Sequence, residues 1–393
     1  MSEKLPKGWK KVKLGEVALY INRGITPKYV EKNGITVINQ KCIRNGNIDF
    51  KLVRLHDINK KFQSEKILQT NDILINSTGV GTAGRVAIYK TSMKATVDSH
   101  VSILRIDTKK AFPKFVFYNL RKREKELEEI AEGSTGQIEL KRENIKEVDI
   151  PLPSLPEQKA IASVLSSFDD KIDLLHRQNQ TLEQMAQTLF RKWFIKDADD
   201  SWEITTIGKE LHTVLGGTPS TSKPEYWDGD IPWINSGEVN RFRIDSPTKF
   251  ITKLGLEKSN TKLLPKGTTV IAITGATLGQ TSLLEIDSCA NQSVVGIIPN
   301  ERLCKEFVYL WAKFKIREII LNETGGAQPH INKNDINETE LIIPPKIYLK
   351  SKIPYLRKLF NKISNNIRQI RTLENLRDTL LPKLMSGEVR VKL

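Results

Sequence analysis

The sequence has 393 residues, with 62 Lys and Arg against 46 Asp and Glu and a formal net charge of +16. This length predicts two or three domains, and a hydrophobic content of 39% indicates that the chain can bury a core and need not be disordered. No apolar run reaches the roughly 20 residues of a membrane span, and the three separated cysteines exclude a disulfide framework. We therefore expect a reduced, cytoplasmic protein without a membrane association, whose partner is an anion.

The charge is distributed unevenly along the chain. Residues 1–152 carry 29 basic and 18 acidic side chains, a net charge of +11, and residues 345–393 carry a net charge of +9. Residues 197–344 have a net charge of −5. A strongly basic segment attracts a polyphosphate through counterion release, although a solubilising surface is the alternative interpretation. The acidic segment argues against uniform coating of a nucleic acid.

Short runs rich in Val and Ile, bounded by Gly, Asn and Pro, predict strands in the first part of the chain. These runs are ITVINQ (35–40), DILINS (72–77), RVAIYK (85–90) and SHVSILRI (99–106). The segment at 112–133 has the composition of a helix. This order predicts a mixed α/β domain over residues 1–152.

A glycine-rich segment, GVGTAG (79–84), separates two of these predicted strands. Its spacing matches the dinucleotide fingerprint, but that motif needs a helix whose N-terminus faces the pyrophosphate. The residues that follow, RVAIYK, favour a strand instead. We therefore expect a glycine-rich hairpin that approaches a partner closely, and no nucleotide site.

Residues 153–196 predict a long helix with a coiled-coil seam. Apolar residues recur in alternating steps of four and three, which is a heptad repeat. Asn179 is the polar member of the seam, and a buried amide there lowers stability but fixes the register. The seam residues are Ile161, Leu165, Phe168, Ile172, Leu175, Asn179, Leu182, Ala186 and Leu189.

The second half of the chain repeats this order. Residues 197–344 contain the strand-like runs TTVIAIT (268–274) and SVVGIIP (293–299) and a helical run at 306–326. Residues 345–393 form a second amphipathic segment, in which we expect Pro382 to disrupt the helix. Its predicted seam residues are Leu356, Leu359, Ile363, Ile367, Ile370, Leu373, Leu376 and Leu380.

Direct sequence matches support a duplication. Residues 132–153 match 323–344 without gaps at an offset of 191, and the same offset aligns 181–192 with 372–383. Further upstream Trp9 aligns with Trp202, and we expect both rings in hydrophobic cores. The chain is therefore predicted to be an α+β protein with a pseudo-two-fold internal repeat, consisting of two similar mixed α/β domains and two long helices. The predicted segments are 1–152, 153–196, 197–344 and 345–393.

The two seams can be buried most simply against each other. Because the second domain must return the chain, we expect an antiparallel coiled coil in which Asn179 lies close to Asn365 and Asn366. The alternative is two independent amphipathic helices, each packed on its own domain.

The sequence lacks recognisable catalytic motifs. It contains no GxxxxGK[ST] phosphate loop, no Asn-Pro-Pro-aromatic tetrad and no convincing carboxylate–carboxylate–Lys set for phosphodiester cleavage. Its five histidines lack an i,i+4 pair or a nearby set of carboxylates that would suggest a metal site, so each is interpreted as a packed or surface residue. We expect no catalytic residue, no metal site and no cofactor in this chain.

Two long segments resemble known proteins. The run at 152–194, LPSLPEQKAIASVLSSFDDKIDLLHRQNQTLEQMAQTLFRKWF, resembles the central conserved region of specificity subunits of type I restriction–modification systems. The run TLENLRDTLLPKLMSGEVRV (372–391) is similar to their distal conserved region. The resemblance implies two target-recognition domains, each reading one half of a bipartite double-stranded DNA target. It also implies that the helical pair sets the spacing and docks two modification (methyltransferase) subunits.

The same resemblance implies where the chemistry takes place. Adenine methylation and the S-adenosylmethionine it needs would belong to the modification subunits. Restriction or motor subunits would supply ATP- and Mg²⁺-dependent translocation and cleavage. This chain would recognise DNA without catalysing a reaction.

Candidate DNA contacts are polar or basic residues in loops that match between the two copies. Base readout needs paired donors and acceptors, whereas Lys and Arg bind phosphate. Ser, Thr and Asn are also common turn residues that bond their own backbone, which is the alternative for each. Gln137 and Gln328 are favoured, because they occupy the same place in both copies. The candidates are Thr26, Lys28, Asn39, Gln40, Lys41, Arg44, Ser77, Thr78, Arg85, Ser134, Thr135 and Gln137 in the first copy, and Thr218, Ser220, Asn235, Ser236, Arg241, Thr274, Thr277, Gln280, Gln328 and His330 in the second.

Two other functions stay open at this point. The first is a restriction enzyme whose nuclease or methyltransferase activity resides in this chain. The second is a coiled-coil adaptor that binds only protein and has no affinity for duplex DNA.

Overall fold

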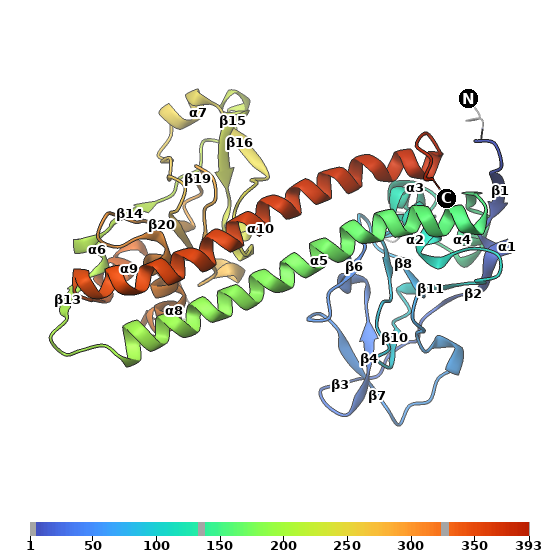
Figure 1. Cartoon of the computed structure of the whole chain (residues 1–393), viewed down its shortest axis with the longest axis horizontal. Coiled ribbons are helices and arrows are strands. Elements are labelled where there is room, and N and C mark those ends of the chain that lie inside the picture. Colours follow the sequence, from blue (N-terminus) through green and yellow to red (C-terminus); the bar gives the residue numbers. More distant parts are fainter. Residues whose placement is uncertain (1–4, 133–137, 324–329, 393) are drawn as a thin grey trace. The chain divides into compact units, whose positions relative to one another are not determined.

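The chain divides into two compact units, which we describe one at a time. The computed structural model describes residues 5–132, 138–323 and 330–392. Unit 1 comprises Met1–Leu174 together with Ile370–Leu393, and unit 2 comprises Leu175–Gln369. Each unit therefore holds one globular part and a portion of both long helices (Figure 1). The four predicted segments follow the sequence repeat, so their boundaries differ from those of the units. Each unit contains one predicted globular segment and parts of both predicted helical segments.

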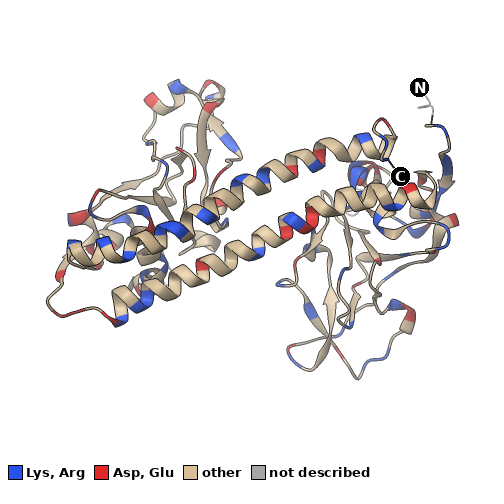
Figure 2. Cartoon of the chain, viewed as in Figure 1, with Lys and Arg blue, Asp and Glu red and all other residues tan. Residues whose placement is uncertain are grey.

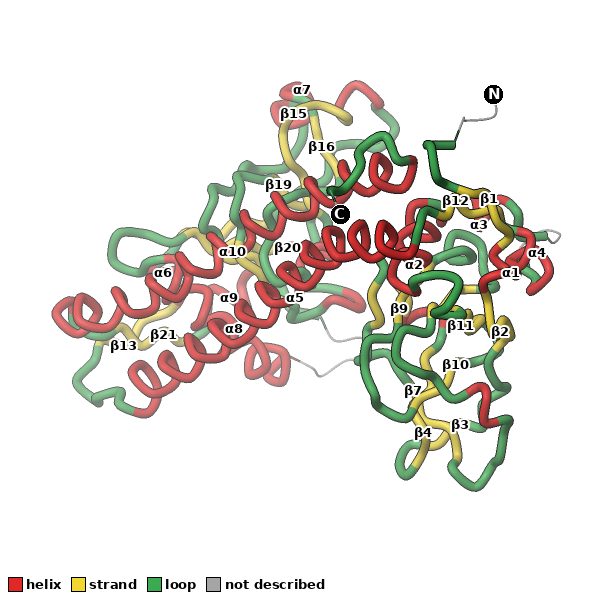
Figure 3. The backbone as a smooth tube through the Cα atoms, turned by 45° about the vertical axis from the view of Figure 1, so that its right-hand side comes forward, coloured by secondary structure: helices red, strands yellow, loops and turns green. Residues whose placement is uncertain are grey.

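The globular part of unit 1 contains two four-stranded sheets and two small sheets of two strands each, β1-β12 and β5-β6. The first four-stranded sheet is antiparallel in the order β2-β11-β8-β9, and the second has the order β10-β4-β7-β3 with β10 parallel to β4. The second sheet lies at the end of the unit that is distant from the long helices (Figures 1 and 3). The strands are β1 (Lys10–Lys13), β2 (Ala18–Arg23), β3 (Tyr29–Val30), β4 (Gly34–Ile38), β5 (Ile43–Arg44), β6 (Asn47–Ile48), β7 (Arg54–Asp57), β8 (Ile73–Asn76), β9 (Val86–Ile88), β10 (Ala95–Val97), β11 (Val101–Ile106) and β12 (Asp149–Leu152).

The first sheet of unit 1 is covered on both faces. Side chains alternate between the faces of a strand, so Ile73 and Ile75 of β8 pack in one hydrophobic cluster with Phe115 and the long helices, while Leu74 packs in another with Ile38 of the second sheet. This burial on both faces explains why the run ILIN is apolar without alternation. All four strands predicted here are confirmed, within one or two residues at each end.

The glycine-rich segment 79–84 joins β8 to β9, which pair antiparallel. Gly79, Gly81 and Gly84 all have positive φ, at 96°, 72° and 82°, a region that L side chains avoid. The predicted hairpin is therefore confirmed.

Short helices complete unit 1. They are α1 (Leu14–Val17), α2 (Pro113–Lys122), α3 (Glu124–Glu129) and α4 (Arg142–Glu147). The single helix predicted over 112–133 is thus divided, because Arg123 leaves the helical region at φ −111° and ψ 19°. Trp9 is buried in the core of this unit, as expected.

Unit 2 repeats this architecture. Its antiparallel sheet has the order β14-β20-β17-β18, and its second sheet has the order β16-β15-β19 with β15 parallel to β19. Trp202 is buried in the main core, as expected. The elements are β13 (Glu203–Thr206), α6 (Ile207–Glu210), β14 (His212–Leu215), β15 (Trp227–Ile234), β16 (Lys249–Ile251), α7 (Lys253–Glu257), β17 (Thr269–Ala272), β18 (Thr281–Leu283), β19 (Cys289–Ala290), β20 (Val294–Ile298), α8 (Lys305–Glu323), α9 (Lys333–Glu338) and β21 (Glu340–Ile343).

The long helices are α5 (Leu155–Arg191) and α10 (Lys346–Ser386). In unit 1, Arg377 pairs with Asp169 of α5, and Arg390, beyond the end of α10, pairs with Glu157. In unit 2, Asn366 bonds Asn179, and the Tyr348 hydroxyl donates to the carbonyl of Trp193. Within each unit a later residue of α5, or of the turn that follows it, therefore meets an earlier residue of the C-terminal segment, so the predicted antiparallel pairing is confirmed. No described helix is long and apolar enough to span a membrane.

The polar pair at the seam of unit 2 is also confirmed. Asn366 Nδ2 donates to Asn179 Oδ1 at 2.9 Å, and both side chains are buried. Asn365 is exposed and bonds Arg368 instead. Among the predicted seam residues of α5, Ile161, Leu165, Ile172, Leu175 and Ala186 are buried, and Phe168, Leu182 and Leu189 are partly buried.

The predicted seam of α10 is wrong in its last part. Leu356, Ile363 and Ile370 are buried and Leu359, Ile367, Leu373 and Leu380 are partly buried, but Leu376 is 47% exposed. The four-and-three stepping continues from Ile370 through Glu374 to Arg377, Leu381 and Leu384, and the last three are buried. Arg377 occupies a seam position because Asp169 neutralises its charge at 2.9 Å.

We expected Pro382 to disrupt the second helix, and this prediction is wrong. The helix continues to Ser386, although a proline cannot donate the bond to the carbonyl four residues earlier. Leu381, Leu384 and Met385 pack in the core of unit 1, and their burial holds this last turn in place.

Candidate nucleic-acid interface

In unit 1 the predicted contact residues gather where two parallel strands end. Asn39 and Gln40 follow β4, and Asp98 follows β10. The backbone N–H of Asp98 donates to the carbonyl of Ile38 at 3.1 Å, so the two loops start side by side. Loops held by a rigid sheet in this way are common carriers of binding residues.

Three side chains form a hydrogen-bonded chain at this place. Thr78 Oγ1 lies 3.1 Å from Gln40 Oε1 and 2.9 Å from His100 Nδ1. A hydroxyl donates one hydrogen bond and can accept another. When Thr78 donates to Gln40, His100 Nδ1 donates to Thr78. The Gln40 amide nitrogen is then a free donor and His100 Nε2 an acceptor, which is the complement of the major-groove edge of adenine.

His100 was missed by sequence reasoning, which interpreted each isolated histidine as a packed or surface residue. Its ring is exposed, and its backbone N–H donates to Asp98 Oδ1 at 3.0 Å. Asp98 lies beneath the loop, and burial raises the pKa of its carboxyl group. His100 lies directly before β11, in a loop that aligns with the loop before β20 in the second repeat. This matching position is the sequence feature that could have identified it.

Unit 2 places equivalent residues at the ends of its own parallel strands. Asn235 follows β15, and Asn291 follows β19, with the Asn291 N–H donating to the carbonyl of Ile234 at 2.9 Å. Asn291 Oδ1 accepts from the N–H of Ser293, as Asp98 does from His100. Thr218 donates to the side chain of Gln292. Sequence reasoning missed Asn291 and Gln292, because neither lies in a strictly matching motif.

Several predicted residues are used by the fold itself. Asn39 accepts from the N–H of Lys41 at 2.9 Å and donates to the carbonyl of Leu52 at 3.0 Å. Asn235 accepts from the N–H of Gly237 at 2.8 Å. Both amides therefore cap the short 3₁₀ turns after their strands, which is the structural alternative that the sequence left open.

Ser77 does not belong to a DNA-contacting surface. It is fully buried, and its hydroxyl lies 2.6 Å from that of Ser102 on the neighbouring strand. The prediction is wrong because residue 77 still belongs to the sheet interior, and the loop begins at Thr78. The arginines of these loops are braced locally, Arg85 by the carbonyl of Gly81 and Arg241 by that of Ser246.

The remaining predicted residues differ in accessibility. Ser134, Thr135, Gln137 and Gln328 lie outside the described residues, so their roles stay predictions. The partly buried ones are Ser236, Thr274 and Thr277. The exposed ones are Thr26, Lys28, Lys41, Arg44, Thr218, Ser220, Gln280 and His330.

Each globular part is attached to α5 by a buried tyrosine, a carboxylate and an arginine. In unit 1 the Tyr118 hydroxyl donates to Asp169 at 2.6 Å, and Arg377 donates to the same carboxylate at 2.9 Å. In unit 2 the Tyr309 hydroxyl donates to Glu183 at 2.6 Å, and Arg243 donates to its other oxygen at 2.8 Å.

Tyr118 and Tyr309 align at the repeat offset of 191. Burial raises the pKa of both phenols, so they act as hydrogen-bond donors.

The match to a known family decides what this duplicated arrangement is. A family model described as the type I restriction modification DNA specificity domain matches residues 6–184 and 200–375, once for each repeat. The chain belongs to the specificity subunits of type I restriction–modification systems.

Individual specificity subunits resemble it along nearly their whole length. The MjaIX specificity subunit of Methanocaldococcus jannaschii is 29% identical over 421 residues, covering 99% of this chain and 95% of that protein. The HindI specificity subunit of Haemophilus influenzae is 22% identical over 466 residues, covering 97% and 99%. The crystal structure of the S subunit from M. genitalium has the same fold, with a TM-score of 0.59 at 17% identity, covering 100% of this chain and 98% of that one.

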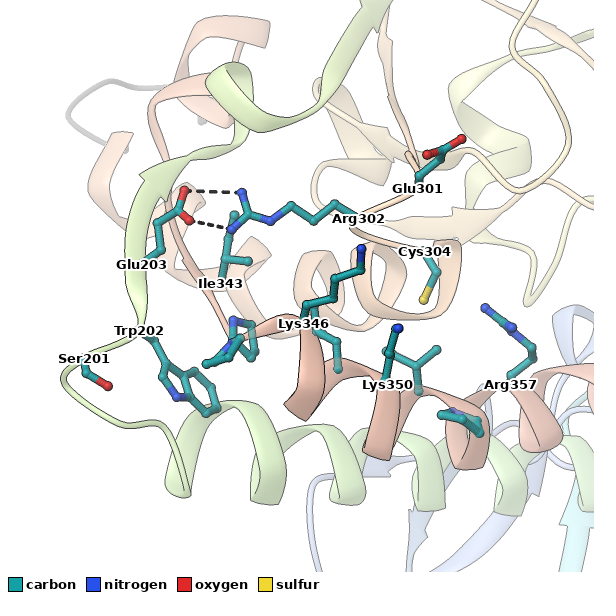
Figure 4. A pocket seen from close by; sticks show the side chains of 15 residues that line it. Ser201, Trp202, Glu203, Glu301, Arg302, Cys304, Ile343, Lys346, Lys350 and Arg357 are labelled. Carbon is teal, nitrogen blue, oxygen red and sulfur yellow. Dashed lines mark hydrogen bonds and ion pairs between the residues drawn. The ribbon is translucent and has the colours of Figure 1, made fainter.

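Unit 2 of this specificity subunit also contains a pocket of about 770 Å³, at the start of α10 (Figure 4). Lys346, Lys350 and Arg357 line it from the helix, and Arg302 pairs with Glu203 across its upper side. Burial raises the pKa of its one thiol, Cys304, to about 11, so this thiol is a poor nucleophile at neutral pH. Among the described residues no group of three or more His, Cys, Asp or Glu could hold a metal ion.

Proposed function

We propose that each globular part of this specificity subunit reads one half of a bipartite DNA target, and that the chain itself catalyses no reaction. The observation that carries the proposal is the pair of equivalent loop clusters, one in each unit. Both clusters lie at the ends of parallel strands, and both present amide, hydroxyl or imidazole groups. Such groups discriminate bases by donor and acceptor pattern.

The paired helices would set the distance between the two half-sites and bind two modification subunits. Adenine methylation and the bound S-adenosylmethionine would then reside in those subunits. ATP, Mg²⁺ and cleavage would reside in restriction or motor subunits.

The purified chain tests this proposal against the two alternatives. Incubated with duplex DNA, Mg²⁺ and labelled S-adenosylmethionine, it should bind DNA without methylating or cutting it. Binding should weaken steeply as salt rises, in proportion to the phosphates that are neutralised. Turnover by the isolated chain would favour an enzyme, and no affinity for any duplex would favour a protein-only adaptor.

The spacer role has its own test. Inserting four residues within 175–182 adds about 6 Å of helix and rotates the phase by about 40°, which keeps the seam nearly in place. Sequencing of methylated adenines should show the same two half-sites with a gap enlarged by at most about two base pairs. An unchanged gap would show that the helices do not set the distance.

A further inference from the structure

Unit 1 contains a cleft whose lining includes only two of the residues predicted to contact DNA, Thr26 and Lys28. It has a volume of about 410 Å³ and lies between the segment before β3 and the loop after β7. Its lining includes Thr26, His56 and four lysines, Lys28, Lys60, Lys61 and Lys66, and we name it the lysine cleft. Figure 2 shows basic residues on the loops around β3 and β7.

The charge of the lysine cleft is positive and largely uncompensated. Lys28 Nζ lies 3.4 Å from the Asp57 carboxylate, and Lys66 Nζ donates to the carbonyl of Gly24 at 2.7 Å. Lys60 and Lys61 are exposed, and neither forms an ion pair within the described part of the chain. Two ammonium groups are therefore free to bind an anion, and a third is only weakly paired.

A buried histidine holds the two edges of the cleft together. His56 is 4% exposed, and its Nδ1 accepts from the backbone N–H of Lys28 at 3.0 Å. Its Nε2 lies 3.0 Å from the carbonyl of Lys60. An acceptor at Nδ1 and a donor at Nε2 define one neutral tautomer. Because this ring bridges the backbones of Lys28 and Lys60, the spacing of their side chains is set before any partner arrives.

The cleft adjoins the loop cluster that contains Gln40 and His100. Ile25, which also lines the cleft, pairs with Asp98 in an isolated bridge, and its N–H donates to the carbonyl of Val97. Thr26 follows directly. An anion seated in the cleft would therefore lie beside the groups that can read a base edge.

We propose that the lysine cleft seats phosphates of the DNA backbone beside the half-site that unit 1 reads. This inference rests on the proposed function, and it assigns the phosphate contacts to named residues. Phosphate contacts fix register and supply affinity, whereas base contacts supply specificity. The globular segment of unit 2, residues 197–344, has a net charge of −5, against +11 for residues 1–152 in unit 1. Between the two globular parts, we therefore expect that of unit 1 to carry more of the salt-dependent binding.

The experiment compares two variants of the full chain with equal charge change. Lys60→Gln with Lys61→Gln removes the free cations of the cleft. Lys109→Gln with Lys125→Gln removes two exposed lysines of unit 1 outside it. Binding is measured between 50 and 200 mM KCl on three duplexes, one DNA that carries the target found by sequencing methylated adenines, one scrambled DNA and one RNA. Methylated adenines are also sequenced in cells that express each variant.

The cleft variant should lower the slope of log K against log salt by about 1.8, since each phosphate contact contributes about 0.9. Wild-type affinity should then fall about 12-fold more than that of the variant over this fourfold range of salt. The loss at low salt should be similar for both duplexes, and the control variant should keep the wild-type slope.

Three outcomes would overturn the proposal. An unchanged slope in the cleft variant, with a steep slope in the wild type, would show that phosphates bind elsewhere and would leave the proposed function intact. A changed methylation target would show that these lysines read bases. Loss of affinity for duplex RNA, with unchanged affinity for DNA, would assign the cleft to a different nucleic acid. A wild-type chain that binds no duplex would instead contradict the proposed function itself.

Discussion

The buried arginine of unit 2 offers the sharpest test of how a recognition domain is attached to the helices. The side chain of Arg243 is 1% exposed and that of Glu183 is 8% exposed. Arg243 also donates to the Tyr309 hydroxyl at 2.9 Å and lies over the rings of Phe242, Tyr309 and Phe360. Its Nη1 also donates to the carbonyl of Phe242 at 2.8 Å, and its Nε has no hydrogen-bond partner among the described groups. Glu183 therefore supplies the opposite charge for this buried cation.

The substitution Glu183→Gln keeps the volume of the side chain but leaves Arg243 as an unpaired buried cation. Removing one partner of a buried ion pair costs about 3–5 kcal/mol. For a folding unit of this size, 1 kcal/mol shifts the melting temperature by about 2–4 °C, so the transition of unit 2 should fall by roughly 6–20 °C. Tyr309→Phe removes a hydroxyl bonded to charged groups and should cost about 1.5–3 kcal/mol.

Calorimetry of the full chain, with hydrogen exchange to locate the transition in unit 2, measures these losses. The matched control is Glu257→Gln, which removes the exposed pair with Lys253 in the same unit and should change stability by less than about 1 kcal/mol. A double variant, Glu183→Leu with Arg243→Met, should recover most of the loss, because apolar residues tolerate the buried site. A loss in Glu183→Gln as small as that of the control would refute the reasoning, since the carboxylate would then not hold the domain.

Three further outcomes follow from individual contacts. Asn179→Leu removes the closer of the two acceptors of the buried Asn366 amide and leaves only Gln178 Oε1 at 3.5 Å, so it should cost about 1–3 kcal/mol in urea unfolding. Changing both Asn179 and Asn366 to Leu should recover the loss. Thr78→Val removes the hydroxyl at the centre of the unit 1 loop cluster. Sequencing of methylated adenines should then show a relaxed first half-site and an unchanged second one. Leu376→Gln should change stability by less than about 0.5 kcal/mol, because Leu376 is exposed. Leu381→Ala should cost about 2–5 kcal/mol, because Leu381 is buried. Equal losses in the two variants would show that Leu376 does belong to the seam.

Most of the architecture could be predicted from local patterns. Strands such as 72–77 and the long helix at 153–196 were predicted correctly because hydrophobic periodicity and turn residues are local features of the sequence. The duplication was visible for a similar reason, since it needs only an alignment of the sequence with itself. Asn179 could be paired with Asn366 because the antiparallel return of a duplicated chain leaves few registers.

The candidate site could be predicted only in part. Gln40 and Thr78 were singled out as loop residues, but His100 joins them through the parallel pairing of β4 with β10, a contact between strands more than fifty residues apart. Ser77 was assigned to the surface because a loop boundary cannot be located to one residue from propensity alone.

The sequence by itself determined the two repeats, their strands, the helical rods and the absence of recognisable catalytic motifs, because these depend on composition and spacing along the chain. Only the tertiary structure decided that Arg377 replaces Leu376 in the seam, that Pro382 stays within a helix, and that His56 joins two loops into one lysine cleft. In each case the free energy comes from a partner distant in sequence, and no local pattern encodes which partner a buried charge, a proline turn or an imidazole will meet.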